Sequence, residues 1–324
     1  MAWINTVTGP LETSALGFCQ PHEHIFTATT PASGKNPALT IDDEERSAEE
    51  LSDFYSCGGQ SMIDCQPYSA GGNPFALRRI SASSAVHVVS VTGYHMPAFY
   101  PSDHWIFTED MYALRERFLA DLTEGVSALH EDGRIFPGAV KAAIGKEGPD
   151  GRFEICLRAA AGAAAAAGVP LILHTETGAG AVSAVSLCEQ EGLDPAHIAV
   201  CHVDRQATDF TVHEAVAHTN AYLEYDTIAR FKYHDDLSEI ALIRHMLSLG
   251  YEKRLLISLD TTASRLRCYG GFPGIDYILR TFIPMLIQAG VSETEIYSIT
   301  HLNPERLFDE AAGSRTVTPT VPVY

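Results

Sequence analysis

Eight short apolar runs, separated by longer segments with helical patterns, constrain the fold of this chain more than any other feature of its sequence. Near-continuous apolar runs are typical of parallel strands that are buried on both faces and covered by helices. Eight such units in 324 residues favour a closed (β/α)8 barrel over an open doubly wound sheet. The runs cover residues 15–18, 61–65, 86–91, 138–142, 170–174, 197–202, 221–225 and 254–260.

The alternation continues without a linker-like change of composition. We therefore predict a single α/β domain over residues 1–312, followed by an irregular tail over 313–324. The chain has neither a GxGxxG motif after its first strand nor a Walker loop, which disfavours nucleotide binding.

Four helices between the runs can be outlined from start and stop signals. One ends at Cys57, a second starts at Thr108 and runs to about His130, and a third covers 152–167 before Gly168. The fourth starts with a pattern that resembles a capping box, Asp235 and Asp236 followed by Glu239, and stops at Gly250. Its expected apolar face carries Leu237, Ile240, Ile243 and Leu247.

Unusual polar side chains fall at the strand ends. In a (β/α)8 barrel the functional site lies at the carboxyl ends of the strands. Two histidines separated by one residue point the same way on a strand, so they can bind one metal ion. The set comprises His22 and His24 at strand one, Lys141 in strand four, His174 at strand five, His202 at strand six and Asp260 at strand eight.

Each of these residues also has a structural explanation. A single histidine at a strand end is more often an ordinary rim residue, and Asp260 alone could cap a helix. Lys141 is harder to explain in this way, because burying an unpaired ammonium group costs several kcal/mol. The joint placement favours a site for Zn²⁺, Mn²⁺ or a similar ion, since such ions prefer imidazole and carboxylate ligands.

The ordered set of motifs resembles the phosphotriesterase family of the amidohydrolase superfamily. The similarity runs from about residue 9 to the closing segment 303–308, and although HxH alone is a weak motif, the ordered set is specific. The matching segments are Gly9-Pro10-Leu11, Leu16-Gly17-Phe18, His22-Glu23-His24, Val140-Lys141, His174-Thr175-Glu176, Cys201-His202-Val203-Asp204-Arg205 and Ser258-Leu259-Asp260.

This resemblance implies a binuclear metal centre. It implies two divalent ions, Zn²⁺ or alternatively Mn²⁺ or Co²⁺, and a carbamate, formed from CO₂ on the amine of Lys141, that bridges them. His22, His24 and Asp260 would bind the more buried ion, and His174 and His202 the more exposed one. The expected mechanism is attack by a metal-bridging hydroxide, with Asp260 as the proton acceptor.

The loops above strands seven and eight carry positive charge in an otherwise acidic protein. The candidate substrate-binding residues are Arg230, Lys232, Arg265, Arg267 and Tyr269, with Tyr94 in the loop after strand three. Arginine and lysine with a tyrosine hydroxyl suit phosphate or carboxylate, although they could equally be solvated loop charges. Family members that hydrolyse phosphorylated sugar lactones are similar here, with a lysine after strand seven and an arginine and a tyrosine after strand eight. Lys232 and Tyr269 match that pattern, whereas the arginine is either Arg265 or Arg267.

These observations predict a lactonase that opens a small anionic sugar lactone, with a phosphorylated lactone favoured. The alternatives are an amidase for small N-acyl amino acids, a phosphotriester hydrolase and, more remotely, a metal-free binding protein.

Composition limits the partners. The net charge of −19 disfavours nucleic acid, which needs clustered lysine and arginine. The seven scattered cysteines fit reduced thiols, and the chain has neither a signal-peptide pattern nor an apolar run near the roughly 20 residues that span a bilayer. We therefore expect a cytoplasmic enzyme with a small-molecule substrate. The family resemblance implies that it forms a homodimer.

Overall fold

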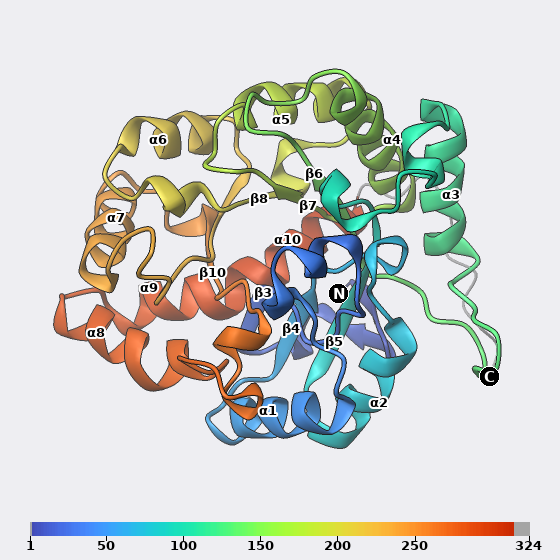
Figure 1. The fold of residues 1–324 in the computed structure, drawn as a ribbon. Helices are drawn as coiled ribbons and strands as arrows, with labels where there is room; N and C mark the ends of the chain where they lie inside the picture. The colour runs from blue at the N-terminus through green and yellow to red at the C-terminus, as the bar shows by residue number, and fades with distance from the viewer. Residues whose placement is uncertain (1, 314–324) are drawn as a thin grey trace.

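A computed structural model describes residues 2–313 and shows a (β/α)8 barrel. Eight parallel strands form one sheet, in which the strands follow each other in chain order from β3 to β10. In Figure 1 the helices α1 to α8 surround these strands, which confirms the predicted architecture. The eight strands are β3 Cys19–Glu23, β4 Ser61–Asp64, β5 His87–Gly93, β6 Ala139–Ala143, β7 Leu171–His174, β8 Ile198–Cys201, β9 Tyr222–Tyr225 and β10 Leu255–Ile257.

The helices and an N-terminal hairpin complete the fold. The antiparallel strands β1 and β2 form a separate two-stranded sheet, and α10 ends the described chain. The predicted tail over 313–324 lies outside the described residues except for Gly313, the last residue of α10. The remaining bounds are β1 Trp3–Thr6, β2 Gly9–Glu12, α1 Glu44–Ser56, α2 Pro74–Ser84, α3 Met111–Thr123, α4 Arg152–Ala167, α5 Ala181–Gln190, α6 Phe210–His218, α7 Asp236–Ser248, α8 Ile283–Gln288, α9 Glu293–Tyr297 and α10 Asn303–Gly313.

Three predicted boundaries are wrong. The first barrel strand starts at Cys19 rather than Ala15, because Gly17 adopts a positive φ of 60° and turns the chain just before the strand. Helix α3 is capped by Asp110, whose side chain accepts from the amide of Ala113, so the helix does not start at Thr108. It also ends at Thr123, well before His130.

Helix α7 matches its predicted range but not its predicted contacts. Asp235 caps the helix by accepting from the amide of Ser238. Glu239 does not complete a capping box; its side chain is buried and lies against His234. Leu237 is 68% exposed, so it does not belong to the buried face, which is formed instead by residues such as Ile240.

The barrel closes between β3 and β10 through side chains and loop backbone. Glu23 is fully buried, and its carboxyl oxygens accept from the amides of Leu259 (2.8 Å) and Thr261 (3.2 Å). The amide between them, that of Asp260, donates to the carbonyl of His22 at 3.2 Å. These bonds fix the loop after β10 against the end of β3, so that Asp260 lies beside His22.

Apolar side chains fill the amino-terminal half of the barrel. An inner cluster joins strand residues such as Ile172 and Leu256 to Ile4 of β1 and to Leu307 and Phe308 of α10. The hairpin and α10 therefore cover one end of the barrel, and the polar site occupies the other end. No helix in the described part of the chain has the length and apolar character that a membrane span requires.

Candidate metal centre

Strand alternation determines which side chains face the barrel interior. Ala139 of β6 packs in the inner cluster, whereas Val140 packs in the outer cluster under the helices. Lys141 therefore faces inward, because successive strand residues point to opposite faces. His174 follows Ile172 of the inner cluster by two residues and faces inward for the same reason.

Four of the predicted ligands form one buried cluster. The Nε2 atom of His22 lies 2.9 Å from Nζ of Lys141, and Nε2 of His24 lies 3.5 Å from Oδ1 of Asp260. One ligand atom from each of His22, His24 and Asp260 falls within 4.8 Å of the others. Each of the four residues is at most 9% exposed.

The other two predicted ligands form a second cluster beside the first. Nδ1 of His174 lies 2.8 Å from Nε2 of His202. The ring of His202 stands 4.9 Å, between centroids, from the ring of His22, so the two clusters adjoin. His202 follows β8 with a positive φ of 65°, a backbone conformation that is uncommon for a histidine and is typical of functional sites.

Asp226, which the strand-end argument did not identify, connects the two clusters. Its carboxylate accepts from Nδ1 of His22 at 2.7 Å and from Nδ1 of His202 at 2.6 Å. Both Nδ1 atoms must carry the proton, because an ionised carboxylate only accepts. Each Nε2 atom therefore presents its lone pair to the centre, which is the usual role of a carboxylate behind a metal-binding histidine.

The electrostatics of the imidazoles suit metal binding. Burial and the nearby Lys141 lower the pKa of His22 to about 4, and burial lowers the pKa of His202 well below its usual value despite Asp226. Burial also raises the pKa of Asp226, but His202 and His22 outweigh this effect and lower it overall. The imidazoles are therefore neutral and Asp226 is ionised at neutral pH, as ligands and their partner must be.

The surroundings of Lys141 fit a modified amine better than a free ammonium group. The residue is fully buried, and its Nζ atom contacts an imidazole nitrogen. Within the described chain it forms no ion pair with a carboxylate inside 4.0 Å. A carbamate on this amine would add the negative charge that two dications need, so the donor set as a whole fits a binuclear centre.

Two arginines share the carboxylate of Asp260. Oδ2 of Asp260 lies 3.0 Å from Arg230 and 3.7 Å from Arg205, and Arg230 also donates to the Asp260 carbonyl. Burial raises the pKa of Asp260, but Arg230 and the nearby His202 lower it well below its usual range overall. The mouth of the centre therefore combines the ionised carboxylate of Asp260 with two guanidinium groups.

Lys232 lies in the loop between β9 and α7 that also carries Arg230. It is exposed, and its Nζ lies 4.6 Å from the ring centroid of Tyr233. The guanidinium of Arg205 lies 5.1 Å from the same ring. The Tyr233 ring therefore contacts both Lys232 and Arg205.

The other predicted substrate-binding residues have partners within the protein. Arg265 donates to the carbonyls of Ile228 (2.7 Å) and Ala229 (3.1 Å), and Arg267 pairs with Asp276. The polar ends of these residues hold the loops together. Two hydroxyls are likewise occupied, since Tyr269 donates to the carbonyl of Asp43 and Tyr94 to that of Ala143, both at 2.7 Å.

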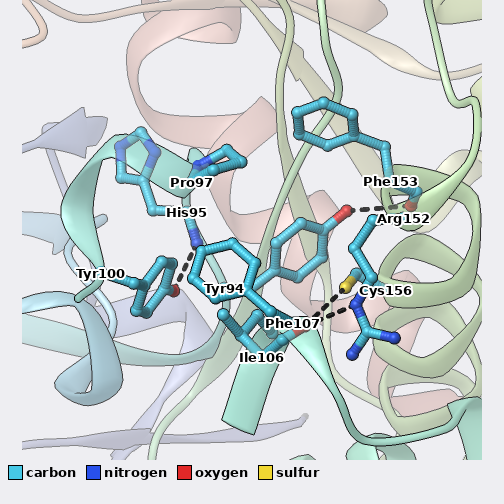
Figure 2. A pocket seen from close by; sticks show the side chains of 9 residues that line it. All are labelled: Tyr94, His95, Pro97, Tyr100, Ile106, Phe107, Arg152, Phe153 and Cys156. Carbon is cyan, nitrogen blue, oxygen red and sulfur yellow. Dashed lines mark hydrogen bonds between the residues drawn. The ribbon is translucent and has the colours of Figure 1, made fainter. Parts of the chain in front are cut away.

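A small apolar cavity, whose lining side chains are drawn in Figure 2, adjoins the centre through His95. It has a volume of about 30 Å³, and its wall includes Tyr94, Pro97, Phe153 and Cys156. A space of this size accepts one or two water-sized groups. Its boundary toward the metal centre is His95, whose ring centroid is 5.2 Å from that of His174.

His95 presents a hydrogen-bond donor. Its Nδ1 accepts from the amide of Met96 at 2.7 Å, and burial followed by the charge of His174 lowers the pKa of its imidazole well below the usual value. A neutral ring that accepts at Nδ1 carries its proton on Nε2. The residue is 6% exposed, and its ring stacks on Phe99 with centroids 4.3 Å apart.

Sequence reasoning could have identified some of the residues that it missed. Asp226 follows directly after the seventh apolar run and obeys the same strand-end rule as His174 and Asp260, so extending that run by one residue would have included it. Arg205 lies in the segment Cys201-His202-Val203-Asp204-Arg205, which carries part of the family resemblance. His95 sits in a recognised loop, but its tautomer depends on local backbone geometry that no sequence pattern encodes.

This fold and this site define a class of protein, the metal-dependent hydrolases built on a (β/α)8 barrel. The sequence model of the Phosphotriesterase family matches residues 2–308, and the chain belongs to that family.

Relatives in this family match nearly the whole chain. A phospho-furanose lactonase from Mycoplasmopsis synoviae is 26% identical over 331 residues, which cover 95% of this chain and 92% of the relative. An N-acetyltaurine hydrolase from Salmo salar is 26% identical and covers 94% of this chain and 97% of its own length. The crystal structure of a lactonase from Listeria monocytogenes has a TM-score of 0.86 at 26% identity, covering 95% of this chain and 99% of that chain.

Proposed function

We propose that this protein is a lactonase that hydrolyses small anionic sugar lactones, with phosphorylated ones preferred. The observation that carries the proposal is the placement of Arg230 and Arg205 at the Asp260 carboxylate, in a centre rich in metal ligands, with Lys232 on the Tyr233 ring that Arg205 also contacts. Two relatives named as lactonases, one of them a phospho-furanose lactonase, support it.

The proposed metal sites follow the two clusters. His22, His24 and Asp260 would bind one divalent ion, His174 and His202 the other, and a carbamate on Lys141 would bridge them. Bound divalent ions supply Lewis acidity, which polarises a carbonyl and lowers the pKa of water. Asp226 keeps the Nε2 lone pairs of His22 and His202 directed at the centre.

The side chains of this protein would then guide the proton. In lactone hydrolysis, the oxygen of water adds to the ring carbonyl carbon, and the bond from that carbon to the ring oxygen breaks. One proton of the water moves to the ring oxygen, which gives a hydroxyl and a carboxylic acid. Asp260 is ionised and lies at the centre, so it can accept this proton and pass it on.

Charge and hydrogen bonding would orient the substrate. The guanidinium groups of Arg230 and Arg205 and the ammonium of Lys232 attract an anionic substituent. His95 can donate from Nε2 to an oxygen of the reacting ester at the opposite wall. A neutral donor there would stabilise negative charge on oxygen without repelling the metal ions.

Variants separate metal binding from substrate binding. Lys141→Ala should lose bound metal and activity. Lys232→Met should keep its metal content and raise KM for an anionic lactone about tenfold, because one charge-assisted contact contributes roughly 1.5 kcal/mol. Lys253→Met, an exposed lysine at η9 (Glu252–Arg254) before β10, is the matched control and should leave KM unchanged. Equal loss of metal in the Lys141 and Lys232 variants would contradict this division of roles.

A second candidate function is hydrolysis of small N-acyl amides with an anionic end. The apolar cavity beside His95, about 30 Å³ in volume, could accept an acetyl methyl group. The N-acetyltaurine hydrolase from Salmo salar supports this reading. Rates with an N-acetyl amino acid and with its N-butyryl analogue test it, because a cavity of this size favours the acetyl compound. If neither amide is hydrolysed while sugar lactones are, the amidase proposal is wrong and the lactonase proposal stands.

A further inference from the structure

A second group of metal-ligating side chains lies next to the catalytic centre but shares no residue with the two predicted clusters. It comprises Asp204 on the short helix η8 (Val203–Gln206), His234 in the loop before α7, and Glu239 in the first turn of α7. One ligand atom from each falls within 4.8 Å of the others. Bonds from Zn²⁺ to such atoms are about 2.0–2.2 Å long, so the three can share one ion.

Two carboxylates in this group are buried with unsatisfied oxygens. Asp204 and Glu239 are both fully buried. Oδ2 of Asp204 accepts from the amide of Thr227 at 2.6 Å, but its Oδ1 has no hydrogen-bond partner in the described chain. Neither oxygen of Glu239 has one there, although Oε2 lies 3.1 Å from Nε2 of His234. Such oxygens are costly to bury unless something binds them.

The tautomer of His234 directs a nitrogen lone pair at the carboxylate of Glu239. Its Nδ1 lies 3.1 Å from the carbonyl oxygen of Asp235, which can only accept, so Nδ1 carries the proton. In the neutral ring, Nε2 then directs a lone pair toward the Glu239 carboxylate and the hydroxyl of Thr227, which is 3.1 Å away. A lone pair that faces a carboxylate oxygen is repulsive unless a cation lies between them. A histidine fixed in this way by a carbonyl is typical of metal ligands.

The surrounding charge is also negative. Burial raises the pKa of the Glu239 carboxyl well above its usual value. The negative charges of Asp204, Asp226 and Asp236 raise it further. The nearby Arg205 is already shared with Glu176 and Asp260. The site therefore needs a positive charge, supplied by a proton or a metal ion.

We propose that Asp204, His234 and Glu239 bind a third divalent cation, distinct from the catalytic pair. Two carboxylates and one imidazole suit Zn²⁺, Mn²⁺ or a similar ion. The bond from Asp204 to the amide of Thr227, directly after Asp226, ties this site to the segment that orients His22 and His202. The third ion thus has a positioning role and takes no part in the chemistry.

Metal content of the full-length protein tests the proposal. The metal-free protein is reloaded with Zn²⁺ or Mn²⁺ alone, dialysed and analysed for ions per chain. Glu239→Gln should lose one ion relative to the wild type, whereas Lys141→Ala should lose the catalytic ions and keep one. Glu214→Gln removes the carboxylate from another histidine pair, 2.8 Å from His245, and should lose none.

A thermal measurement isolates the third site from the proposed catalytic function. In the Lys141→Ala background, Zn²⁺ should still raise Tm, and the added Glu239→Gln change should abolish that rise. Anomalous diffraction from Mn²⁺-loaded wild-type crystals should give a peak among Asp204, His234 and Glu239. If the proposed catalytic centre is wrong, the number of ions bound by the wild type changes. The difference in Tm between the Lys141→Ala variant with and without Glu239→Gln does not.

Two results would overturn the third site. One is an anomalous map of saturated wild-type protein without a peak among these three residues, which would mean that the carboxylates share a proton. The other is an unchanged metal content in Glu239→Gln. Should that variant fail to fold, the anomalous map decides alone.

Discussion

Replacement of Asp226 by asparagine tests how the centre controls its histidines. The carboxylate accepts two Nδ1–H groups, from His22 at 2.7 Å and from His202 at 2.6 Å. An asparagine side chain of the same shape has only one acceptor oxygen, and its amide group donates. One histidine must therefore move its proton to Nε2, which removes the lone pair that the metal site requires.

The expected loss of metal affinity follows from the known effect of removing the hydrogen-bond partner of a metal-binding histidine. Loss of such a partner weakens metal affinity about 10- to 100-fold, which corresponds to roughly 1.4–2.7 kcal/mol. The ion bound by the histidine that lost its Nε2 lone pair should be affected most, so the affinities for the two proposed ions should fall unequally. Loss of the buried negative charge of Asp226 acts in the same direction, because it no longer stabilises cations in the centre.

Competition with a chelator of known affinity measures this change. Asp226→Asn is compared with the wild type and with Asp209→Asn, whose aspartate caps α6 at the surface by accepting from the amide of Thr211. The control should retain wild-type metal affinity and lose only a little thermal stability. Unchanged metal affinity in Asp226→Asn would refute the argument, because the tautomers would then not depend on the carboxylate.

Three further predictions concern other parts of the molecule. His95→Phe keeps the ring stacked on Phe99 but removes the Nε2 donor, so kcat should fall about 10- to 100-fold at unchanged metal content; an unaltered kcat would exclude His95 from the reaction. Gly93→Ala should destabilise the fold and weaken metal binding, because Gly93 has a φ of 104° and an added Cβ would lie 2.1 Å from the carbonyl oxygen of Lys141. Thermal denaturation and metal analysis of this variant check both effects. Burial lowers the pKa of His213 from 6.5 to about 4. The unfolded chain therefore binds a proton in this range that the folded protein excludes, and stability should fall by about 1.6 kcal/mol from pH 6.5 to 5. Urea titrations at the two pH values should show a smaller fall in His213→Gln, and an equal fall would assign the dependence to other groups.

Periodic patterns in the sequence predicted the framework well. The alternation of strands and helices predicted the barrel. The strand-end rule predicted that His174 and His202 share one site, and their ring nitrogens lie 2.8 Å apart. This rule works because parallel strands in a barrel all end at the same rim. The same rule would have found Asp226 if the seventh run had been extended by one residue.

Loop geometry accounts for what the sequence could not predict. Arg265, Arg267 and Tyr269 lie close together in the sequence as a predicted substrate-binding group, yet each bonds to a group of the protein itself. Leu237 satisfies the helical period of α7 but is 68% exposed, because it falls on the edge of the buried face. Such contacts depend on tertiary packing, which has no local period.

The most direct test of the proposed lactonase is its initial rate on matched sugar lactones that differ only in a phosphate group. The protein is loaded with Zn²⁺ or Mn²⁺, and acid release is followed with a pH indicator. The arrangement of Arg230, Arg205 and Lys232 predicts a kcat/KM at least tenfold higher for the phosphorylated lactone. Equal rates on both lactones would contradict the anionic pocket, and absence of activity on every lactone would contradict the lactonase itself.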